Sequence, residues 1–392
     1  MATGLLVSGI QEMPIYGVSI TSLSHGKTSA AAATRESRAT TCARDNEVLH
    51  VRRLSARALS CQDRRRRVRW SDVVRYSDID RRRSWRNVVE LKNGNIVVPG
   101  SISNLGPGFD ALAVAVELYL RIRILEVRPD APDTLETIFP SGPPPGGNRI
   151  EVAWKLARER FAIPAPGLQI EVTSEIPVTA GLGSSAAAAV AGLQLYAAVT
   201  SPRSLDDLLS IACELEGHPD NAAAALLGGM TVSCVRDDGH VIARSWRPPG
   251  ELRFVVATPV TTLETSRSRR ALPQHVALTD AVYNIQRAVL LVKSLESGRF
   301  EDLREALRDR LHQPARAPLV PALAEALAIA HPAVLGVCLS GAGSSVVALA
   351  TAERSAEAAR ELADVYRRLG IPHTIRTLRA HQPAAAILHQ TI

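Results

Sequence analysis

The stretch PVTAGLGSSAAAAVAGLQLY, residues 177–196, joins a glycine-rich turn to an alanine-rich run. Glycine reaches backbone conformations with positive φ, and because it has no Cβ it lets a ligand approach the backbone closely. The run over 184–199 predicts a helix with Ser184 or Ser185 near its N-cap. The free N–H groups and positive dipole end of a first helical turn favour an anion such as phosphate. A plain turn before a buried helix would give the same pattern, so both interpretations stay open at this point.

Length, apolar content and cysteine usage limit the class of protein. The 392 residues are enough for two domains with cores of their own. Charges interrupt every apolar run before it reaches the ~18 residues that cross a bilayer, so no membrane partner is expected. The five cysteines are scattered without a Cys-x-x-Cys pair, which argues against a disulfide framework or a structural zinc site and favours a reducing compartment.

The excess positive charge lies in the first 90 residues, which hold 17 Lys/Arg against 9 Asp/Glu. Because no nucleic-acid-binding motif accompanies these arginines, residues 1–92 are interpreted as an Arg/Ser-rich, poorly ordered extension, and a nucleic-acid partner is not expected. The segment loosely resembles an organelle transit peptide, which leaves a plastid location as the alternative. Its nine acidic residues favour the cytoplasm instead. A misassigned start codon is a third alternative.

The remaining chain predicts an α+β protein of two domains, 93–247 and 248–392, divided at RPPGE in residues 247–251. Residues 129–147, with six prolines and three glycines, predict a loop. Strands are expected at 95–98, 118–124, 168–172, 230–235, 252–258, 334–339, 345–350 and 373–378. Helices are expected at 149–161, 184–199, 204–216, from 218 to the glycine pair 228–229, and at 276–297, 301–312, 319–330 and 353–369.

Two polar clusters follow predicted elements. Asn104 and Asp110 fall in a tight loop of PGSISNLGPGFDALAVAVEL, residues 99–118, where both are also ordinary turn residues. In ELEGHPDNAAAALLGG, residues 214–229, Glu216 offers a carboxylate to a hard cation. The same segment holds polar groups that could orient a substrate or cap a helix: His218, Asp220 and Asn221.

Two arginine-containing stretches complete the set, TSRSRRALP at 265–273 and DRLHQPARAPLVP at 309–321. An arginine fork can bind a carboxylate through two parallel hydrogen bonds. A lone arginine is more often a solvated surface charge, so neither stretch is decisive by itself.

Together these segments resemble the GHMP small-molecule kinases and, within them, the branch that acts on homoserine. They occur in that family's order, and LSGAGSSVVAL at 339–349 is similar to its C-terminal glycine motif. The resemblance implies a two-domain GHMP kinase fold. Its N-terminal ATP-binding domain is ribosomal-protein-S5-domain-2-like, and its C-terminal domain is ferredoxin-like.

The resemblance also implies an activity, its cofactors and an assembly. The γ-phosphoryl group of ATP would be transferred to the side-chain hydroxyl of L-homoserine, giving O-phospho-L-homoserine for threonine biosynthesis. Mg²⁺ would be held by Ser185 and Glu216, and a homodimer is common in the family. The implied ATP-binding residues are Asn148, Pro177, Gly181, Leu182, Gly183, Ser184, Ser185 and Ala186.

Homoserine is a zwitterion, so its site must offer both signs of charge. The resemblance assigns its carboxylate to Arg269 and Arg316, and its ammonium group to Asp110 and Asp220. The expected orienting residues are Asn104, His218, Asn221 and Thr265. Some family members have an aspartate where this chain has Asn221, and an amide cannot accept the hydroxyl proton as a carboxylate does. Asn221 and Thr265 are therefore expected to position the hydroxyl, with no general base.

Overall fold

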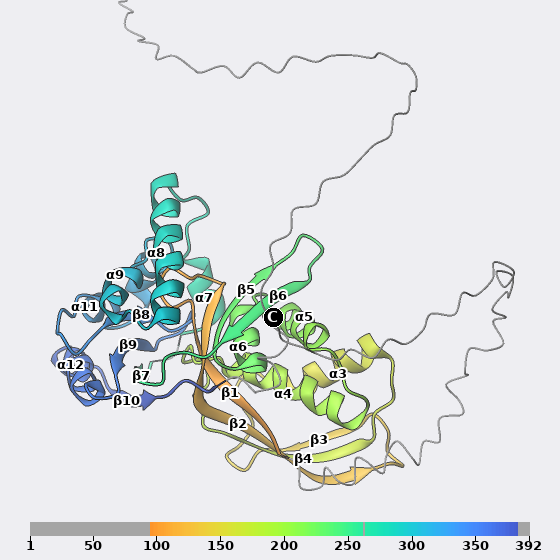
Figure 1. The fold of residues 1–392 in the computed structure, drawn as a ribbon. Coiled ribbons are helices and arrows are strands. Elements are labelled where there is room, and N and C mark those ends of the chain that lie inside the picture. The colour runs from red at the N-terminus through yellow and green to blue at the C-terminus, as the bar shows by residue number, and fades with distance from the viewer. Residues whose placement is uncertain (1–94, 262, 383–392) are drawn as a thin grey trace, which may run out of the picture. The chain divides into compact units, whose positions relative to one another are not determined.

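The computed structural model describes residues 95–261 and 263–382. Residues 1–92 lie outside this range, and with them the expectations of a poorly ordered extension, a transit peptide and nucleic-acid binding. Two β-sheets form within it, each with helices packed against it (Figure 1). The buried apolar side chains form two main clusters: the larger packs residues of both sheets together, and the smaller belongs to the second sheet and its helices. Among the described residues, no helix combines the length and the apolar character that crossing a bilayer requires.

The first sheet has six strands in the spatial order β3-β4-β2-β5-β6, with β1 also paired to β2. Every pairing is antiparallel except that of β3 with β4. The bounds are β1 (Asn95–Ser103), β2 (Leu112–Arg128), β3 (Leu135–Ile138), β4 (Gly167–Ser174), β5 (Met230–Val235) and β6 (Val241–Trp246). The central β2 is longer than the alternating stretch 118–124, because its first five residues are all buried and show no alternation.

Four helices belong to this sheet: α3 (Arg149–Phe161), α4 (Ser184–Val199), α5 (Leu205–Glu216) and α6 (Asp220–Leu227). The alanine-rich α4 lies among the other three and buries most of its circumference. Small side chains let the helices approach closely, since a Cβ on Gly192 of α4 would meet the Ile150 carbonyl oxygen of α3 at 2.4 Å. This tight packing fixes the N-terminal end of α4, where the glycine-rich turn enters.

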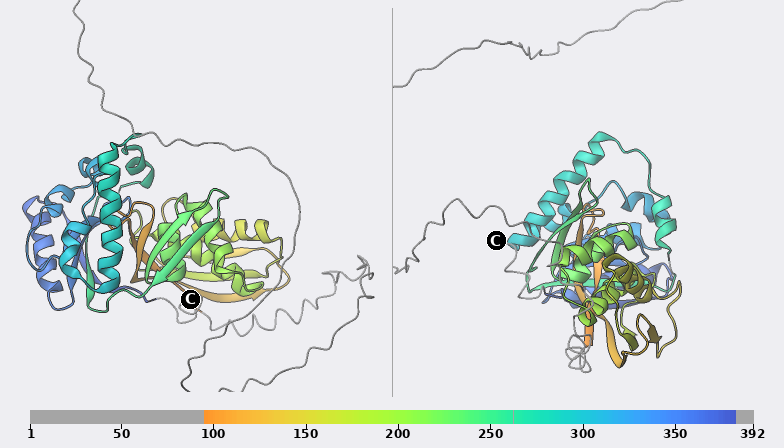
Figure 2. Two further views of the ribbon diagram at one scale, coloured as in Figure 1. Left: turned by 45° about the horizontal axis from the view of Figure 1, so that its top comes forward. Right: turned by 90° about the vertical axis from the view of Figure 1, so that its right-hand side faces the viewer.

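The second sheet has four antiparallel strands in the order β10-β7-β9-β8. They are β7 (Leu252–Pro259), β8 (Gly336–Leu339), β9 (Val346–Thr351) and β10 (His373–Leu378). The helices are α7 (Thr265–Arg270), α8 (Leu278–Ser297), α9 (Leu303–Ala306), α10 (Gln313–Arg316), α11 (Leu323–Leu327) and α12 (Ser355–Arg368), with 3₁₀ turns at Phe300–Asp302 and Ala317–Leu319. Helix α12 packs on the sheet with Ala358, Leu362 and Val365 buried, and α8 runs along the outside of this group (Figure 2).

Several element predictions are wrong in part. The expected helices 301–312 and 319–330 are replaced by the short α9, α10 and α11. The first of these is interrupted where the Asp309 carboxylate accepts the backbone N–H groups of Leu311, His312 and Gln313 and so forms a turn. The predicted loop 129–147 contains β3, which pairs with β4 although its sequence is surrounded by prolines. Strand β6 and helix α7 were not predicted.

The chain returns to the first sheet after β10. Ala380 bridges to Val116 of β2, and the N–H group of Gly229 donates to the His381 carbonyl at 2.8 Å. The predicted boundary at 247–251 is where the chain passes from β6 to β7, but residues 379–381 form a second crossing that sequence analysis missed. The chain therefore crosses between the two sheets at two places.

Candidate active site

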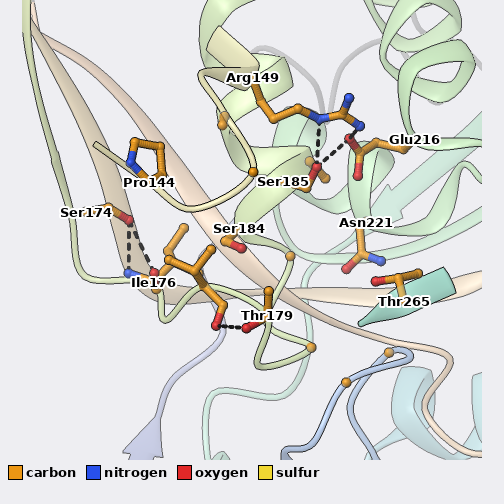
Figure 3. A pocket seen from close by; sticks show the side chains of 18 of the residues that line it. Pro144, Arg149, Ser174, Ile176, Thr179, Ser184, Ser185, Glu216, Asn221 and Thr265 are labelled. Atoms are coloured by element: carbon orange, nitrogen blue, oxygen red, sulfur yellow. Dashed lines mark hydrogen bonds and ion pairs between the residues drawn. The ribbon is translucent and has the colours of Figure 1, made fainter. Parts of the chain in front are cut away.

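A cavity of about 640 Å³ lies between the loops of the two sheets. It collects residues from every sequence segment singled out above, some of which are drawn in Figure 3. The predicted site residues that line it are Asn104, Asp110, Asn148, Gly181, Gly183, Ser184, Ser185, Ala186, Glu216, His218, Asp220, Asn221, Thr265, Arg269 and Arg316.

Two predicted ATP-binding residues, Pro177 and Leu182, do not line the cavity. The Leu182 side chain is 1 % exposed and belongs to the core of the first sheet. Its carbonyl accepts the Ser101 N–H group at 3.0 Å. Leu182 therefore anchors the glycine-rich turn to β1 rather than lining the cavity.

The glycine-rich turn has a backbone that only glycine adopts easily. Gly181 and Gly183 have φ values of +78° and +72°. A Cβ on Gly181 would lie 2.2 Å from the Ser340 carbonyl oxygen, in the loop that joins β8 to β9. The Ser340 hydroxyl donates to the Gly181 carbonyl at 2.6 Å. The second sheet thus braces the turn that the first sheet presents.

The start of α4 differs from the predicted capping. The N-cap residue is Gly183, which has no side chain, and neither Ser184 nor Ser185 caps the helix. The first-turn N–H groups consequently have no side-chain partner at the place where Ser184, Ser185 and Ala186 line the cavity. Free N–H groups and the helix dipole make this end of the cavity an anion-binding site.

The Ser185 hydroxyl does not cap α4 because it bonds to Glu216 at the C-terminal end of α5. It donates to Oε1 of Glu216 at 2.8 Å (Figure 3). A third side chain joins them, since Nε of Arg149 donates to Ser185 at 3.1 Å and its Nη2 donates to Glu216 at 2.9 Å. Glu216 is 8 % exposed, so this pairing keeps a mostly buried carboxylate neutralised.

Asn148 has a structural role that its place before α3 explains. Its Oδ1 accepts the backbone N–H groups of Ile150 and Glu151, which makes it the N-cap of that helix. Its Nδ2 donates to the Thr137 hydroxyl at 3.0 Å. Asn148 lines the cavity, and its contact with adenine stays a prediction.

The opposite end of the cavity is rich in charge. Arg269 of α7 donates two hydrogen bonds to Asp110, at 3.1 and 2.7 Å. The sequence analysis assigned these residues to opposite ends of a bound zwitterion, whereas here they bind each other. The Arg269 guanidinium also lies near the ring of Phe109, 5.7 Å from its centroid.

Arg316 is the most deeply buried charge at this end, with 0 % exposure. Its Nη1 donates to the Gly341 carbonyl at 3.2 Å and to Nδ1 of His312 at 3.1 Å. Because Nδ1 accepts, the Nε2–H group of His312 must donate to the Gly106 carbonyl, which lies 2.7 Å away. Burial lowers the pKa of His312, in agreement with this neutral form.

The Arg316 guanidinium has spare donors. Its Nε and Nη2 atoms have no hydrogen-bond partner among the described residues. Burial lowers the pKa of Arg316 to about 10, so it stays charged at neutral pH. A buried cation with unused donors at a cavity wall is suited to a ligand carboxylate.

His218 and Asp220 form a buried pair, with Nδ1 of His218 2.7 Å from Oδ1 of Asp220. Burial by itself would lower the pKa of His218, but the hydrogen bond and charge of Asp220 outweigh it and raise that pKa. Burial would raise the pKa of Asp220, and the bond from His218 reverses this and lowers it. One polar atom each of Asp110, His218 and Asp220 lies within 4.8 Å of the others, so the two carboxylates are neighbours.

Asn221 is held in one orientation. Its Oδ1 accepts from the Ser101 hydroxyl at 2.7 Å, and its Nδ2 donates to Ser103 at 2.9 Å. An amide fixed in this way has no proton-accepting role. Thr265 at the start of α7 also lines the cavity, and Figure 3 shows its side chain beside that of Asn221 in this view.

Sequence reasoning missed several residues of this site. Arg149 directly follows Asn148, but nothing in the sequence shows that it reaches α5. His312 lies within the quoted stretch 309–321, and only its spacing of four residues from Arg316 on a helical turn could have indicated the contact.

Comparisons with known proteins agree with this geometry. Residues 148–229 match the model of the GHMP kinase N-terminal domain, and residues 291–368 match that of the GHMP kinase C-terminal domain. The homoserine kinase of Moorella thermoacetica is 38% identical over 296 residues, covering 74% of this chain and 98% of its own. That of a Thermus thermophilus strain is 40% identical over 270 residues, covering 68% of this chain and 90% of its own. The crystal structure of homoserine kinase from Cytophaga hutchinsonii superposes with a TM-score of 0.64 at 26% identity, covering 74% of this chain and 95% of that one.

The chain belongs to the GHMP kinase family. Within that family, the two relatives named above and a relative from Desulfitobacterium hafniense, 35% identical over 298 residues, are homoserine kinases. The two-domain α+β fold expected from sequence is thereby confirmed, and the protein is an ATP-dependent phosphotransferase.

Proposed function

We propose that this protein transfers the γ-phosphoryl group of ATP to the side-chain hydroxyl of L-homoserine. The observation that carries the proposal is a single cavity with two unlike ends. One end offers the free N–H groups of α4 to an anion, and the other offers paired carboxylates and arginines to a zwitterion.

The charged end matches an amino acid in both signs of charge. Arg316 provides unused donors for the carboxylate, and Arg269 is the second candidate once it exchanges Asp110 for substrate. Asp110 is the group best able to receive the ammonium group, since Asp220 is 1 % exposed and already bonded to His218. Asn104 supports this arrangement from the loop, because its Oδ1 accepts the N–H group of Asp110.

The other end fits a magnesium nucleotide. The backbone of Gly181–Ala186 would bind the phosphates, with Asn148 near the base. Ser185 and Glu216 supply hydroxyl and carboxylate oxygens 2.8 Å apart, the hard ligands that Mg²⁺ prefers, at a point that already holds a guanidinium cation. Bound Mg²⁺ would neutralise charge on the phosphate oxygens during transfer.

Catalysis at this site would be positioning rather than base catalysis. Asn221 is fixed by Ser101 and Ser103, and Thr265 lines the same cavity, so the two can orient the acceptor hydroxyl. The hydroxyl proton would leave late, to phosphate or solvent. Conversion of Asn221 to Asp tests this account, because a hundredfold rate increase with a shifted pH profile would contradict it.

The decisive experiment measures ADP release from Mg-ATP with L-homoserine and two truncated acceptors. 4-Hydroxybutyrate lacks the ammonium group and 3-amino-1-propanol lacks the carboxylate, while both keep the hydroxyl. We expect turnover with L-homoserine and a large loss of kcat/KM with either analogue, because 3-amino-1-propanol cannot use the spare donors of Arg316 and 4-hydroxybutyrate cannot bind to Asp110. Equal turnover with mevalonate would indicate another acceptor, and ATP binding without any turnover would indicate a regulator that has lost catalysis.

We also propose that the protein acts as a homodimer in the cytoplasm. Helix α8 exposes an apolar stripe of Leu278, Val282, Ile285 and Val289, a surface suited to a second copy. All three described cysteines are free, as in a reducing compartment. Light scattering during size-exclusion chromatography tests the dimer, and Ile285→Glu should convert it to a monomer.

A further inference from the structure

Arg149 stands at the proposed cation site although no sequence motif identified it. It is the first residue of α3, and its guanidinium reaches across to α5. There it donates to the Ser185 hydroxyl, to the Leu215 carbonyl and to the Glu216 carboxylate. The Ser185 hydroxyl and the Glu216 carboxylate are the two groups that suit a divalent cation. Because the guanidinium bonds to both of them, it takes the place of that cation.

The positive charges of the cavity are divided between its two ends. Among the described residues that line it, the arginines are Arg149, Arg269 and Arg316, and lysine is absent from that lining. Arg269 and Arg316 lie at the zwitterion end, both beside Phe109. Arg149 is therefore the side-chain cation available to the nucleotide phosphates at the other end.

The Arg149 side chain is free enough to change partners. It is 38 % exposed, whereas its partner Glu216 is 8 % exposed. Its Nε and Nη2 atoms make the protein contacts, and Nη1 makes none that the described residues provide. A long, partly exposed arginine side chain can move away from its carboxylate when a second cation neutralises that carboxylate instead.

We propose that Arg149 is a nucleotide-binding residue that exchanges one anion for another. Without nucleotide it neutralises Glu216 and holds Ser185. When a divalent cation takes those two oxygens, the guanidinium moves to the polyphosphate that arrives with it, so Glu216 is neutralised at both stages. This inference rests on the proposed use of a magnesium nucleotide at this end of the cavity.

The exchange predicts opposite changes in the affinity for metal-free ATP in two variants, one at each partner of the resting ion pair. Isothermal titration calorimetry with ATP in EDTA measures this affinity. Arg149→Met should weaken metal-free ATP by about ten- to a hundredfold, since hydrogen bonds between charged groups are lost. Glu216→Gln should instead bind metal-free ATP more tightly than the wild type, because Arg149 is released from its resting partner. The double variant Arg149→Met/Glu216→Gln separates this effect from the simple loss of a negative charge near the phosphates. If Glu216→Gln tightens metal-free ATP as much in the Arg149→Met background as in the wild type, Arg149 takes no part in the increase and the exchange is wrong.

The matched control is Arg160→Met. Arg160 lies on the same helix and pairs with Glu214 of α5 at 2.7 Å, but both side chains are half exposed and outside the cavity lining. It should bind metal-free ATP as the wild type does. Arg149→Lys keeps the positive charge but lacks the parallel N–H donors of the guanidinium, so it should retain part of the affinity for ATP. Partial retention would show that the loss in Arg149→Met does not come from a folding defect.

A second readout uses Mn²⁺ alone, followed by electron paramagnetic resonance in the absence of nucleotide. Arg149→Met should bind Mn²⁺ more tightly than the wild type, because the competing cation is gone. Unchanged metal-free ATP affinity in Arg149→Met, or Mn²⁺ affinity that falls, would overturn the exchange. If the wild type fails to phosphorylate homoserine, the proposed function is wrong. If the wild type phosphorylates homoserine but Arg149→Met and Arg160→Met bind metal-free ATP equally well, only this inference is wrong.

Discussion

Arg269 and Asp110 bind each other through two hydrogen bonds across 159 residues of chain. The two charges that an incoming zwitterion needs are thus already paired before it arrives. Both side chains are about one-third exposed, so the pair faces the cavity rather than the core. Substrate binding must either open this pair or add to it, with Arg316 as the fixed cation beside it.

Removing the mobile member of this pair should affect the acceptor more than the nucleotide. We expect Arg269→Ala to raise KM for L-homoserine by about 10- to 150-fold, the loss of one or two charged hydrogen bonds, with KM for ATP little changed. Steady-state kinetics at saturating ATP measures this. Arg267→Ala, on the exposed side of the same helix, is the control, and equal effects of the two variants would contradict the assignment.

Arg316 should matter more for binding than for stability. Arg316→Met leaves the Gly341 carbonyl and Nδ1 of His312 without the donor that Arg316 provides, which should lower stability by about 1 to 3 kcal/mol. We expect kcat/KM for L-homoserine to fall by about 10- to 150-fold. Calorimetry and kinetics test this against Arg310→Met, an exposed arginine of the same segment that pairs with Asp280. A large fall in stability with unchanged kcat/KM would assign Arg316 a structural role.

The raised pKa of His218 depends on Asp220. In Asp220→Asn the charge is lost while burial remains, so the pKa of His218 should fall below its ordinary value. Titration of the imidazole by nuclear magnetic resonance measures this directly. A His218 pKa that is unchanged in the variant would show that the two groups are not coupled.

The same pair predicts how stability changes with pH. His218 has a raised pKa, so its contribution is complete below the unfolded value of about 6.5 and is lost as pH rises through the folded pKa. Asp220 has a lowered pKa, so its contribution is complete above about 3.9 and is lost as pH falls through the folded pKa. The contribution of the pair to the free energy of unfolding should therefore be greatest between about pH 4 and 6.5. Urea unfolding of wild type and Asp220→Asn across this range tests it.

Two glycines with similar positive φ values separate backbone strain from steric contact. Gly298 ends α8 at φ +70° with open space around it, so Gly298→Ala should cost about 1 to 2 kcal/mol from the backbone alone. Gly181→Ala has the same strain and also places a Cβ 2.2 Å from the Ser340 carbonyl oxygen, which adds about 1 to 3 kcal/mol.

Only Gly181→Ala should also weaken nucleotide binding, because it displaces the turn before α4. Chemical denaturation and ATP titration of both variants separate the two effects. Equal destabilisation of the two proteins would mean that the loop joining β8 to β9 moves freely and does not brace the turn.

Sequence predicted the elements whose pattern is local. Helices α3, α4, α5 and α12 and strands β5 and β7 begin and end close to the expected residues, because caps, glycine stops and burial periodicity are written within each segment. The expected helix 301–312 was wrong because helix propensity there yields to Asp309, whose carboxylate bonds to the backbone of the following turn. Strand β3 was missed because its partner, not its own composition, makes it a strand.

The site was predictable in its membership and less so in its contacts. The polar residues of each motif do meet in one cavity, which Pro177 and Leu182 do not line. Their partners depend on distant segments, which is why the pairing of Asp110 with Arg269 and of Arg149 with Glu216 could not be deduced. Ser185 illustrates the difference, since the sequence favoured a helix cap and the fold turns the hydroxyl to α5.

The return of residues 379–381 to β2 has a mechanical consequence. The chain joins the two sheets covalently at 247–251 and fastens them a second time after Leu378, with a shared apolar core between them. A segment that is tied at both ends resists being pulled away more than one that is tied at a single end, so shortening the chain at residue 378 would leave the second sheet attached by one covalent connection and by packing alone.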